Sequence, residues 1–523
     1  MDFQREYRLL LILPKDLTLN YQLFSKNVGL ITRMATGSAP LSLATIAALT
    51  PANFKTRIID ENIEEIDFDE KYDLIGITGN TYHINQAKEI AKTFSKRNIP
   101  VVCGGYSVSV CPERWRSFAD VLIIGEAERM WPKFLNDFIS GSYKKEYIEN
   151  ERFDLSVSPV PDYSGISRSN LRKYSFGVVQ ANRGCPFKCD FCSVAVYAGN
   201  KIRYKPVDNI IQEIDQIQKI WKCRYIFIVD DNFCADIQKA KEVLAALKAW
   251  NSKQRRQVTF TTQISIDCAK DDEFLTMAAE AGLNMLSIGI ETPNIESLKE
   301  ARKYQNVVAN INESVKKIHQ YGITIMANSI VGFDNDDLSI FKKQFEFFSE
   351  LGIASVNIYQ LLAFDGTPLK ERMIKEGRYI YQNETLFGKG QYFNLLDASN
   401  IIPKNMSVGQ LKNGVIWLLN ELYITSNYVE RFKTFFKNFE SSDKKKEIAI
   451  PKTFLDFAVI GMVIRLTIFI LFRATSSERD AFDKMLRIAF KSTHKQRFGI
   501  LLFYYTRLLN YQNFLSVITR ECN

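Results

Sequence analysis

Three of the nine cysteines in this 523-residue chain lie on one short stretch, at Cys185, Cys189 and Cys192. The C-x3-C-x2-C spacing places three thiolates on one loop, where they can bind three irons of a [4Fe-4S] cluster and leave the fourth iron open for a substrate. A structural zinc site normally needs a fourth ligand, and the next cysteine is as distant as Cys223. The spacing therefore favours an iron-sulfur cluster. The nine cysteines are odd in number and scattered along the chain, so they do not indicate a disulfide framework.

Six apolar runs, separated by helical patterns, begin just before this loop. The runs span residues 176–183, 225–232, 258–265, 285–292, 324–333 and 355–364, and the helical patterns span 209–221, 240–250, 273–282, 308–322 and 341–352. This alternation predicts a partial (β/α)6 barrel of the TIM type, whose active-site residues lie at the carboxyl ends of the strands. Polar residues do collect at those ends, at Asp230, Asp231, Asn232, Gln263, Ser265, Glu291, Thr292 and Asp334.

Another α/β pattern precedes the barrel. Its apolar runs are 7–14, 54–60, 72–79, 99–105 and 120–126, with helical patterns such as 84–97 between them. The pattern predicts a parallel, Rossmann-like sheet, in which a ligand lies beyond the carboxyl ends of the strands. The residues expected there are small or polar: Thr78, Gly104, Gly105, Ser107, Gly125 and Glu126. They suit the close approach of a large cofactor, although the glycines could also serve only as tight turns.

The remaining segments complete the domain organisation. Residues 146–172 contain few apolar residues, and we interpret them as a linker between a first domain at 1–145 and the barrel at 173–390. Residues 391–523 contain helical patterns alone, at 411–423, 428–438, 454–472, 477–490 and 497–509, and indicate an α-helical domain. This last part holds the charge excess, because residues 401–523 carry 19 Lys and Arg against 10 Asp and Glu.

The cysteine triplet, with the aromatic Phe191 before its last cysteine, resembles the radical S-adenosylmethionine (SAM) superfamily. That resemblance implies that Cys185, Cys189 and Cys192 hold the cluster, whose open iron binds SAM. It also implies that Asp230, Asp231, Asn232 and Gln263 lie near the SAM amino group, Glu291 on a later SAM-binding strand, and Gly332 and Asp334 near the adenine. The family uses a one-electron reductant such as flavodoxin or ferredoxin.

The first domain resembles the cobalamin-binding domain of B12-dependent radical SAM enzymes. The similarity rests on residues 40–43 (PLSL), 104–109 (GGYSVS), 111–113 (CPE) and 125–128 (GEAE). It implies that Thr78, Gly104, Gly105, Ser107, Gly125 and Glu126 contact cobalamin. The Asp-x-His-x-x-Gly signature that supplies a cobalt-ligating histidine in other cobalamin enzymes is absent, and His83 lies outside any such motif. A vestigial domain without cobalamin is the alternative interpretation.

The helical extension resembles a subgroup that includes hopanoid methylases, bacteriochlorophyll side-chain methylases and tetraether-lipid ring synthases. The resemblance implies a methyltransferase that acts on an unactivated carbon of an apolar, lipid-like small molecule. Radical C–C bond or ring formation without methyl transfer is the first alternative. A sensor that binds cobalamin and an Fe-S cluster without consuming SAM is the second.

The apolar stretch 457–472 is too short to span a bilayer, which takes about 20 residues, and Arg465 lies near its centre. It is either a core helix or an interfacial helix that contacts anionic lipid, flanked by Arg473, Lys484, Arg487, Lys491 and Arg497. No segment resembles a nucleic-acid recognition motif. The start of the chain lacks the pattern of a signal peptide, so we expect a cytoplasmic enzyme with peripheral contact to the inner face of the membrane.

Overall fold

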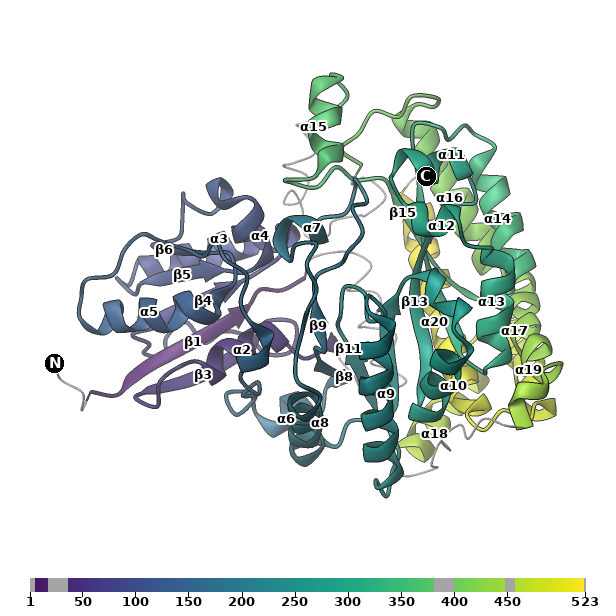
Figure 1. Ribbon diagram of the computed structural model, residues 1–523, viewed down its shortest axis with the longest axis horizontal. Helices are drawn as coiled ribbons and strands as arrows, with labels where there is room; N and C mark the ends of the chain where they lie inside the picture. Colours follow the sequence, from purple (N-terminus) through teal and green to yellow (C-terminus); the bar gives the residue numbers. More distant parts are fainter. Residues whose placement is uncertain (1–4, 17–35, 381–398, 447–456, 522–523) are drawn as a thin grey trace.

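The computed structural model describes residues 5–16, 36–380, 399–446 and 457–521. Figure 1 shows two parallel sheets side by side, with the first sheet in one lobe and the larger sheet, backed by helices, in the other. The central strands of the first sheet are nearly continuous apolar runs because helices cover both faces of such a parallel sheet. The α/β fold class, with a helical C-terminal region, is confirmed.

The first sheet has six parallel strands in the order β3-β1-β4-β5-β6-β7. The strands are β1 (Tyr7–Leu13), β3 (Phe54–Asp60), β4 (Leu74–Thr78), β5 (Val101–Gly104), β6 (Val121–Ile124) and β7 (Glu146–Ile148), and their helices are α2 (Leu41–Ala48), α3 (Ile84–Ser95), α4 (Tyr106–Val110) and α5 (Ala127–Ile139). The five expected strands are present. The stretch interpreted as a linker begins with β7, which is only three residues long and therefore gives no periodic signal.

The second sheet is a curled half-barrel of seven strands in the order β15-β14-β13-β12-β11-β8-β2. Its strands are β2 (Thr36–Ser38), β8 (Tyr174–Val179), β11 (Tyr225–Ile228), β12 (Thr259–Ile264), β13 (Leu283–Glu291), β14 (Thr324–Val331) and β15 (Ser355–Gln360). Its larger helices are α8 (Val207–Trp221), α9 (Ile237–Ser252), α10 (Asp272–Ala281), α13 (Ile311–Gln320) and α14 (Ile340–Leu351). The six predicted strands are found. The seventh, β2, comes from the first domain and pairs with β8, so the two lobes share backbone hydrogen bonds.

Short elements lie between the longer strands and helices. They are α6 (Arg168–Leu171), β9 (Asn182–Arg183), α7 (Val194–Tyr197), β10 (Arg203–Tyr204), α11 (Ile295–Glu300), α12 (Tyr304–Val307) and α15 (Pro368–Lys375).

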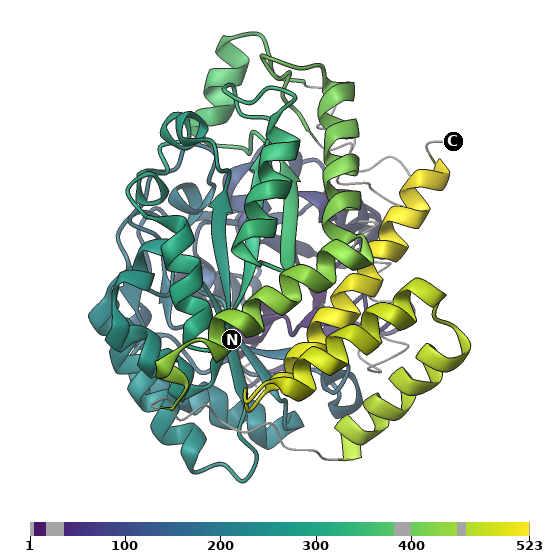
Figure 2. The same cartoon turned by 90° about the vertical axis from the view of Figure 1, so that its right-hand side faces the viewer.

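Among the described residues the C-terminal region holds five long helices, which Figure 1 and Figure 2 show on the side of the larger lobe that faces away from the first sheet. They are α16 (Val408–Tyr423), α17 (Thr425–Glu440), α18 (Phe457–Phe472), α19 (Ser476–Lys491) and α20 (Arg497–Glu521). Within the described residues, none of the helices combines the length and apolar character needed to cross a membrane.

Candidate active site

The cysteine loop leaves the barrel through a tight backbone contact. β9 pairs with β10 in antiparallel fashion, and Cys185 N donates a hydrogen bond to Gly199 O at 3.3 Å. Gly184, which lies between β9 and Cys185, has a φ of +106°, and a Cβ there would lie 2.9 Å from Lys201 O. Glycine is therefore required at this position, where the chain enters the loop.

The three thiols lie in one another's electrostatic field. Burial raises the pKa of all three, that of Cys192 to about 12, and the charge on Cys189 raises the pKa of Cys185 and Cys192 further. The Lys303 ammonium acts in the opposite direction on all three, and Gln305 Nε2 donates to Cys189 Sγ at 3.7 Å. In the described part of the chain, no group of three His, Cys, Asp or Glu side chains is close enough together to hold one metal ion.

Lys303 forms a buried ion pair with Glu291 at the end of β13. Glu291 has a φ of +64°, a strained conformation for a residue with a side chain. A Cβ on Gly289 would lie 2.6 Å from Lys303 Nζ and would overlap the Glu291 carboxylate, so the pair covers Gly289 on the inner face of the sheet. Burial lowers the pKa of Lys303, but Glu291 and Cys189 raise it more, so the lysine stays charged.

The carboxyl end of β11 fastens the cysteine loop to the barrel. Asp230 accepts hydrogen bonds from Ala181 N at 2.7 Å and Asn182 N at 3.0 Å. Asp231 accepts from Gly184 N at 3.0 Å and from the Tyr197 hydroxyl at 2.7 Å. Burial raises the pKa of Asp230 to about 7. The predicted residues of this strand thus border the cysteine loop, while their contact with SAM stays a prediction.

Two further predicted residues of this group lie on neighbouring strands. Asn232 Nδ2 donates to Ser265 Oγ at 3.0 Å, which joins the ends of β11 and β12. Gln263 is exposed although it lies inside β12, as expected of a side chain that faces the open interior of the half-barrel.

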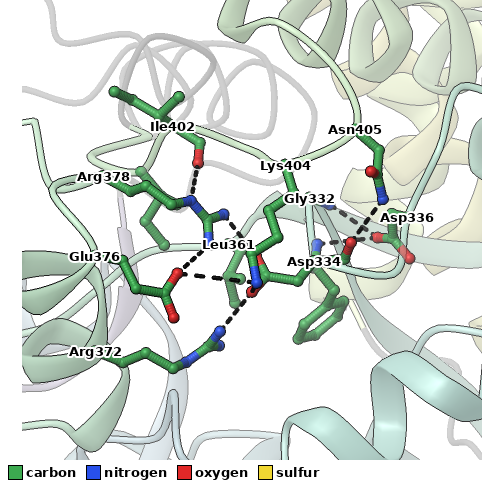
Figure 3. A network of polar contacts seen from close by, with 12 residues as sticks. Gly332, Asp334, Asp336, Leu361, Arg372, Glu376, Arg378, Ile402, Lys404 and Asn405 are labelled. Carbon is green, nitrogen blue, oxygen red and sulfur yellow. Dashed lines mark hydrogen bonds and ion pairs between the residues drawn. The ribbon is translucent and has the colours of Figure 1, made fainter.

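Asp334 pairs with three cations, as Figure 3 shows, and its contact with SAM stays a prediction. Its carboxylate contacts Arg372 at 2.5 Å, Arg378 at 2.6 Å and Lys404 at 3.0 Å. Burial raises the pKa of Asp334, but these cations lower it more, to about 2. Asp334 therefore holds α15 and the chain near residue 404 against the barrel. Its short sequence motif could not reveal cations that come from so far along the chain.

Gly332 begins the turn that carries Asp334. It has a φ of +100°, and Asp336 accepts hydrogen bonds from Gly332 N at 3.0 Å and Phe333 N at 3.1 Å. This turn follows β14 directly, so Gly332 lies at the carboxyl end of the sheet as expected.

The predicted cobalamin residues gather at the carboxyl ends of β4, β5 and β6. Gly105 has a φ of +103°, and a Cβ there would lie 2.6 Å from Thr78 Oγ1. Gly125 has a φ of +92° and abuts the backbone of Glu149. Ser107 is fully buried and accepts a hydrogen bond from Trp115 Nε1 at 3.1 Å. These small residues allow the ends of the strands to lie close to neighbouring backbone and side chains. Gly104, at the end of β5, belongs to the same row of small residues.

Glu126 of the first lobe forms ion pairs with arginines of the barrel lobe. It accepts two hydrogen bonds from Arg203, both at 2.7 Å, and pairs with Arg183 at 3.4 Å. Glu128 also pairs with Arg183, at 2.9 Å. Because Arg183 precedes Cys185 by two residues, these acids of the first lobe orient the cysteine loop.

An aromatic contact also links the two edges. The Tyr106 ring, on α4, meets the Tyr197 ring edge-on at 5.1 Å, and the Tyr106 hydroxyl hydrogen-bonds Ser193, next to Cys192. The cysteine loop and the glycine-rich edge of the first sheet therefore face each other.

His83 is occupied by a local contact. Its Nδ1 accepts a hydrogen bond from Asn80 N at 3.2 Å, and burial lowers its pKa to about 4. The neutral ring thus closes the turn that precedes α3.

Three family models match successive parts of the chain. A B12-binding domain matches residues 29–135, the radical SAM superfamily matches residues 179–348, and a domain of unknown function matches residues 367–519. In this combination of matches the chain is similar to the radical SAM proteins that carry a B12-binding domain. The two named domains supply the two edges described above.

Relatives within this group include named methyltransferases. The chain is 28% identical to an uncharacterized methyltransferase of Synechocystis over 81% of this chain and 78% of the relative. It is 29% identical to the hopanoid C-2 methylase of Rhodopseudomonas palustris over 73% and 72%. It is 25% identical to the bacteriochlorophyllide d C-12(1)-methyltransferase of Chlorobaculum tepidum over 74% and 88%.

Solved structures share the fold of this chain. The cobalamin-dependent SAM radical enzyme OxsB, with aqua-cobalamin and SAM bound, aligns with a TM-score of 0.61 and 14% identity over 99% of this chain and 80% of OxsB. The radical SAM methyltransferase TsrM from Kitasatospora setae, with cobalamin and a [4Fe-4S] cluster bound, aligns with a TM-score of 0.57 and 16% identity over 71% and 75%.

Sequence reasoning did not identify Lys303, Gln305 or Arg183 as site residues. Lys303 lies between α11 and α12, and Gln305 lies within α12. Both belong to a polar stretch with no periodic pattern. Arg183 directly precedes Gly184 and Cys185, and this adjacency is the one signal that could have revealed it.

Proposed function

We propose that this protein is a cobalamin-dependent radical SAM enzyme that transfers a methyl group to an unactivated carbon of an apolar, lipid-like molecule. The observation that carries the proposal is the meeting of two edges, one with three thiols beside a buried lysine and one with a narrow row of small residues. Tyr106 and Glu126 of the first lobe contact the segment that carries the cysteines.

The residues of the barrel edge fit a [4Fe-4S] cluster and SAM. Cys185, Cys189 and Cys192 are soft thiol ligands on one loop, and the positive charge of Lys303 favours their thiolate form. Three buried acceptor atoms nearby, Asp230 Oδ2, Gln305 Oε1 and Asn306 Oδ1, have no protein partner. Such atoms suit the amino and hydroxyl groups of SAM, because a buried acceptor without a partner is costly.

The residues of the first edge fit a large, flat cofactor held by backbone contact. Gly104, Gly105 and Gly125 leave the backbone without side chains at the ends of β5 and β6, and at Gly105 and Gly125 the Thr78 side chain and the Glu149 backbone occupy the place that a Cβ would take. Because the sequence lacks the Asp-x-His-x-x-Gly signature and the His83 side chain is buried, we propose that cobalamin is held without a histidine ligand from this chain.

When bound, the cluster and SAM supply one-electron chemistry that acts on an unreactive C–H bond, and cobalamin supplies the methyl group. The contacts of Tyr106 and Glu126 with the cysteine segment would place the two cofactors toward each other. The positive charge of Lys303 would balance the negative charge of the thiolates. Methylation is preferred to ring formation because the relatives over the longest alignments are methyltransferases.

The hopanoid methylase among these relatives supports the proposal of a lipid-like acceptor. Apolar acceptors favour an enzyme that works at a surface, so the proposal includes peripheral contact with the inner face of the membrane. It also includes a flavodoxin or ferredoxin as the electron donor.

Product mass decides the proposal. Anaerobically reconstituted enzyme would be incubated with a lipid extract, cobalamin, reductant and SAM whose methyl group carries deuterium, and the lipids would be analysed by mass spectrometry. A product that gains the labelled methyl group supports methyl transfer. A loss of two hydrogens without label indicates ring formation, and cofactor binding without SAM consumption indicates a sensor.

A further inference from the structure

The inner face of the half-barrel continues beyond the cofactor residues toward β15. Ser329 of β14 points outward, because its hydroxyl donates to Gln344 of α14 at 2.6 Å. Since side chains alternate along a strand, Asn328 and Ile330 face the interior of the half-barrel. Both keep partial exposure whereas Ala327, Ser329 and Val331 are buried, so there is open space in front of the inner face.

A ladder of polar side chains crosses this inner face. Asn328 Nδ2 donates to Ser287 Oγ of β13 at 3.0 Å, and Asn357 Nδ2 of β15 donates to Asn328 Oδ1 at 2.9 Å. Asn357 Oδ1 in turn accepts hydrogen bonds from Arg507 Nη2 and from the Tyr511 hydroxyl, both on α20. Asn328 pairs in register with Gly289, which lies under the Glu291–Lys303 pair. The ladder therefore leads from the cofactor residues to Arg507.

Arg507 is a cation whose counter-ion is not supplied by the described residues. It forms no ion pair with a described Asp or Glu, its Nη1 donates to none of the described residues, and its buried Nε has no partner. Its neighbours are neutral phenols, and the guanidinium lies 5.1 Å from the Tyr511 ring centroid. A desolvated cation without a counter-ion is costly unless an anion joins it.

Arg431 provides an instructive contrast, because it is the more deeply buried arginine of the same region. Its side chain is 1% exposed, and it donates to two backbone carbonyls, Ile353 O at 2.9 Å and Leu422 O. Arg431 is thus sealed within the core and connects segments of the chain. Arg507 remains partly exposed and lies at the open inner face, where a small molecule can reach it.

We propose that Arg507, positioned by Asn357 and Tyr511, binds a carboxylate or phosphate group of the acceptor inside the half-barrel. The inference rests on the proposed function for the presence of an acceptor and adds its chemical class, an anionic amphiphile. Guanidinium geometry suits both oxyanions. Met326 and Ile330, which lie on either side of Asn328 on the same face, supply apolar walls for the rest of the molecule.

Binding of simple probes to the full chain tests this inference without turnover. Dodecyl phosphate and laurate carry the two oxyanions, and dodecanol is the neutral control of equal chain length. Isothermal titration calorimetry should show that Arg507→Gln weakens binding of an anionic probe by about 10- to 100-fold, the range for hydrogen bonds to a charged group. Dodecanol binding should change little.

Asn357→Asp is the second variant, and it keeps Arg507. A carboxylate there would pair with the guanidinium and should abolish the preference for the anionic probes even if Arg507→Gln fails to fold. Equal affinity for dodecanol and the anions in the wild-type chain would overturn the proposal. A loss of SAM affinity in Arg507→Gln with unchanged probe binding would also overturn it, because the arginine would then serve the cofactor. A failure of methyl transfer leaves these binding results unaffected, so the two failures are distinguishable.

Discussion

The two edges that meet at the candidate active site are built from different kinds of residue. The barrel edge carries buried charges and thiols, among them Asp230, Glu291, Lys303 and the three cysteines. The edge of the first sheet carries glycines in positive φ and a buried serine. The barrel edge therefore depends on electrostatic balance, whereas the first edge depends on the absence of side chains. The predictions below test this difference, beginning with the largest effect.

Loss of the thiols should have the largest effect. Replacing Cys185, Cys189 and Cys192 together with Ala should remove the cluster and abolish SAM cleavage, because these residues are its expected ligands. Iron content and 5′-deoxyadenosine release check this in anaerobically reconstituted protein, in which the wild type should hold about four irons. Cys223→Ala, a buried cysteine away from the loop, is the matched control and should keep both. Continued release from the triple variant would show that the cysteines are not the site.

Removal of the lysine charge should have the next largest effect. Lys303→Met leaves Glu291 buried without its partner and exposes the thiolates to its charge. SAM cleavage should fall by about 100-fold or more, the scale measured for loss of one preorganised charge-stabilising donor. The readouts are 5′-deoxyadenosine release and iron content.

Lys299→Met is the control for that variant, since Lys299 forms an exposed pair with Glu296 on α11. Lys303→Arg should recover part of the activity because it keeps the charge. Equal cleavage by the Lys303→Met and Lys299→Met variants would remove Lys303 from the site.

These two predictions differ in how far the sequence alone could support them. The cysteine spacing identifies its own chemistry, and apolar runs identify most strands because burial on both faces requires them. Lys303 has no such pattern, since its role arises from the fold of the chain between β13 and α13. The same is true of Asp334 and Glu126, whose partners lie 38 and 77 residues away in Arg372 and Arg203. Ion pairs of that separation follow from the tertiary fold and leave no local signal.

The first edge should respond to added volume more than to lost charge. Gly105→Ala places a Cβ 2.6 Å from Thr78 Oγ1 at a φ of +103°, which costs about 1–3 kcal/mol in backbone strain. To relieve the contact the Thr78 side chain must move, and because Thr78 is a predicted cobalamin contact, cobalamin affinity followed by absorbance titration should fall by about 10-fold, which corresponds to about 1.4 kcal/mol. Gly409→Ala on α16 has open space and serves as the control. Unchanged cobalamin affinity in Gly105→Ala would mean that the cofactor does not approach this turn.

His83→Ala should have a small effect at the same edge. The imidazole is buried and its Nδ1 closes a turn, so its loss should cost some stability and leave the absorption spectrum of bound cobalamin largely unchanged. Electron paramagnetic resonance of the Co(II) form reports the axial ligand directly. A change in the nitrogen hyperfine pattern on His83→Ala would show that this histidine ligates cobalt and would reverse the interpretation.

A surface outside both edges lies on α18, far from the cysteine loop in the sequence. One face of α18 packs on the core through Leu466, which is 2% exposed, and the opposite face presents Ile464, Ile468, Leu471 and Phe472, which are 52–79% exposed. Arg473 follows at the end of this apolar row, and Lys491 and Lys495 are exposed nearby in the sequence. Lys484 and Arg487, expected to contact headgroups, pair instead with Asp480 and Asp483 at 2.7 Å.

An apolar row beside exposed cations fits the interface of an anionic bilayer, so purified protein should co-sediment with anionic vesicles. Binding should weaken as salt rises, because headgroup attraction is screened within about 8–10 Å. Ile468→Glu should reduce the bound fraction by about 10-fold, since a buried Ile contributes about 1.5–3 kcal/mol and the charge repels anionic lipid. Ile148→Glu, which is also half-exposed but lies on β7, should leave binding unchanged. Protein that stays in the supernatant with both anionic and neutral vesicles at low salt would exclude the membrane contact. The charge dependence of the barrel edge and the steric dependence of the first edge would be unaffected by that result, because neither involves α18.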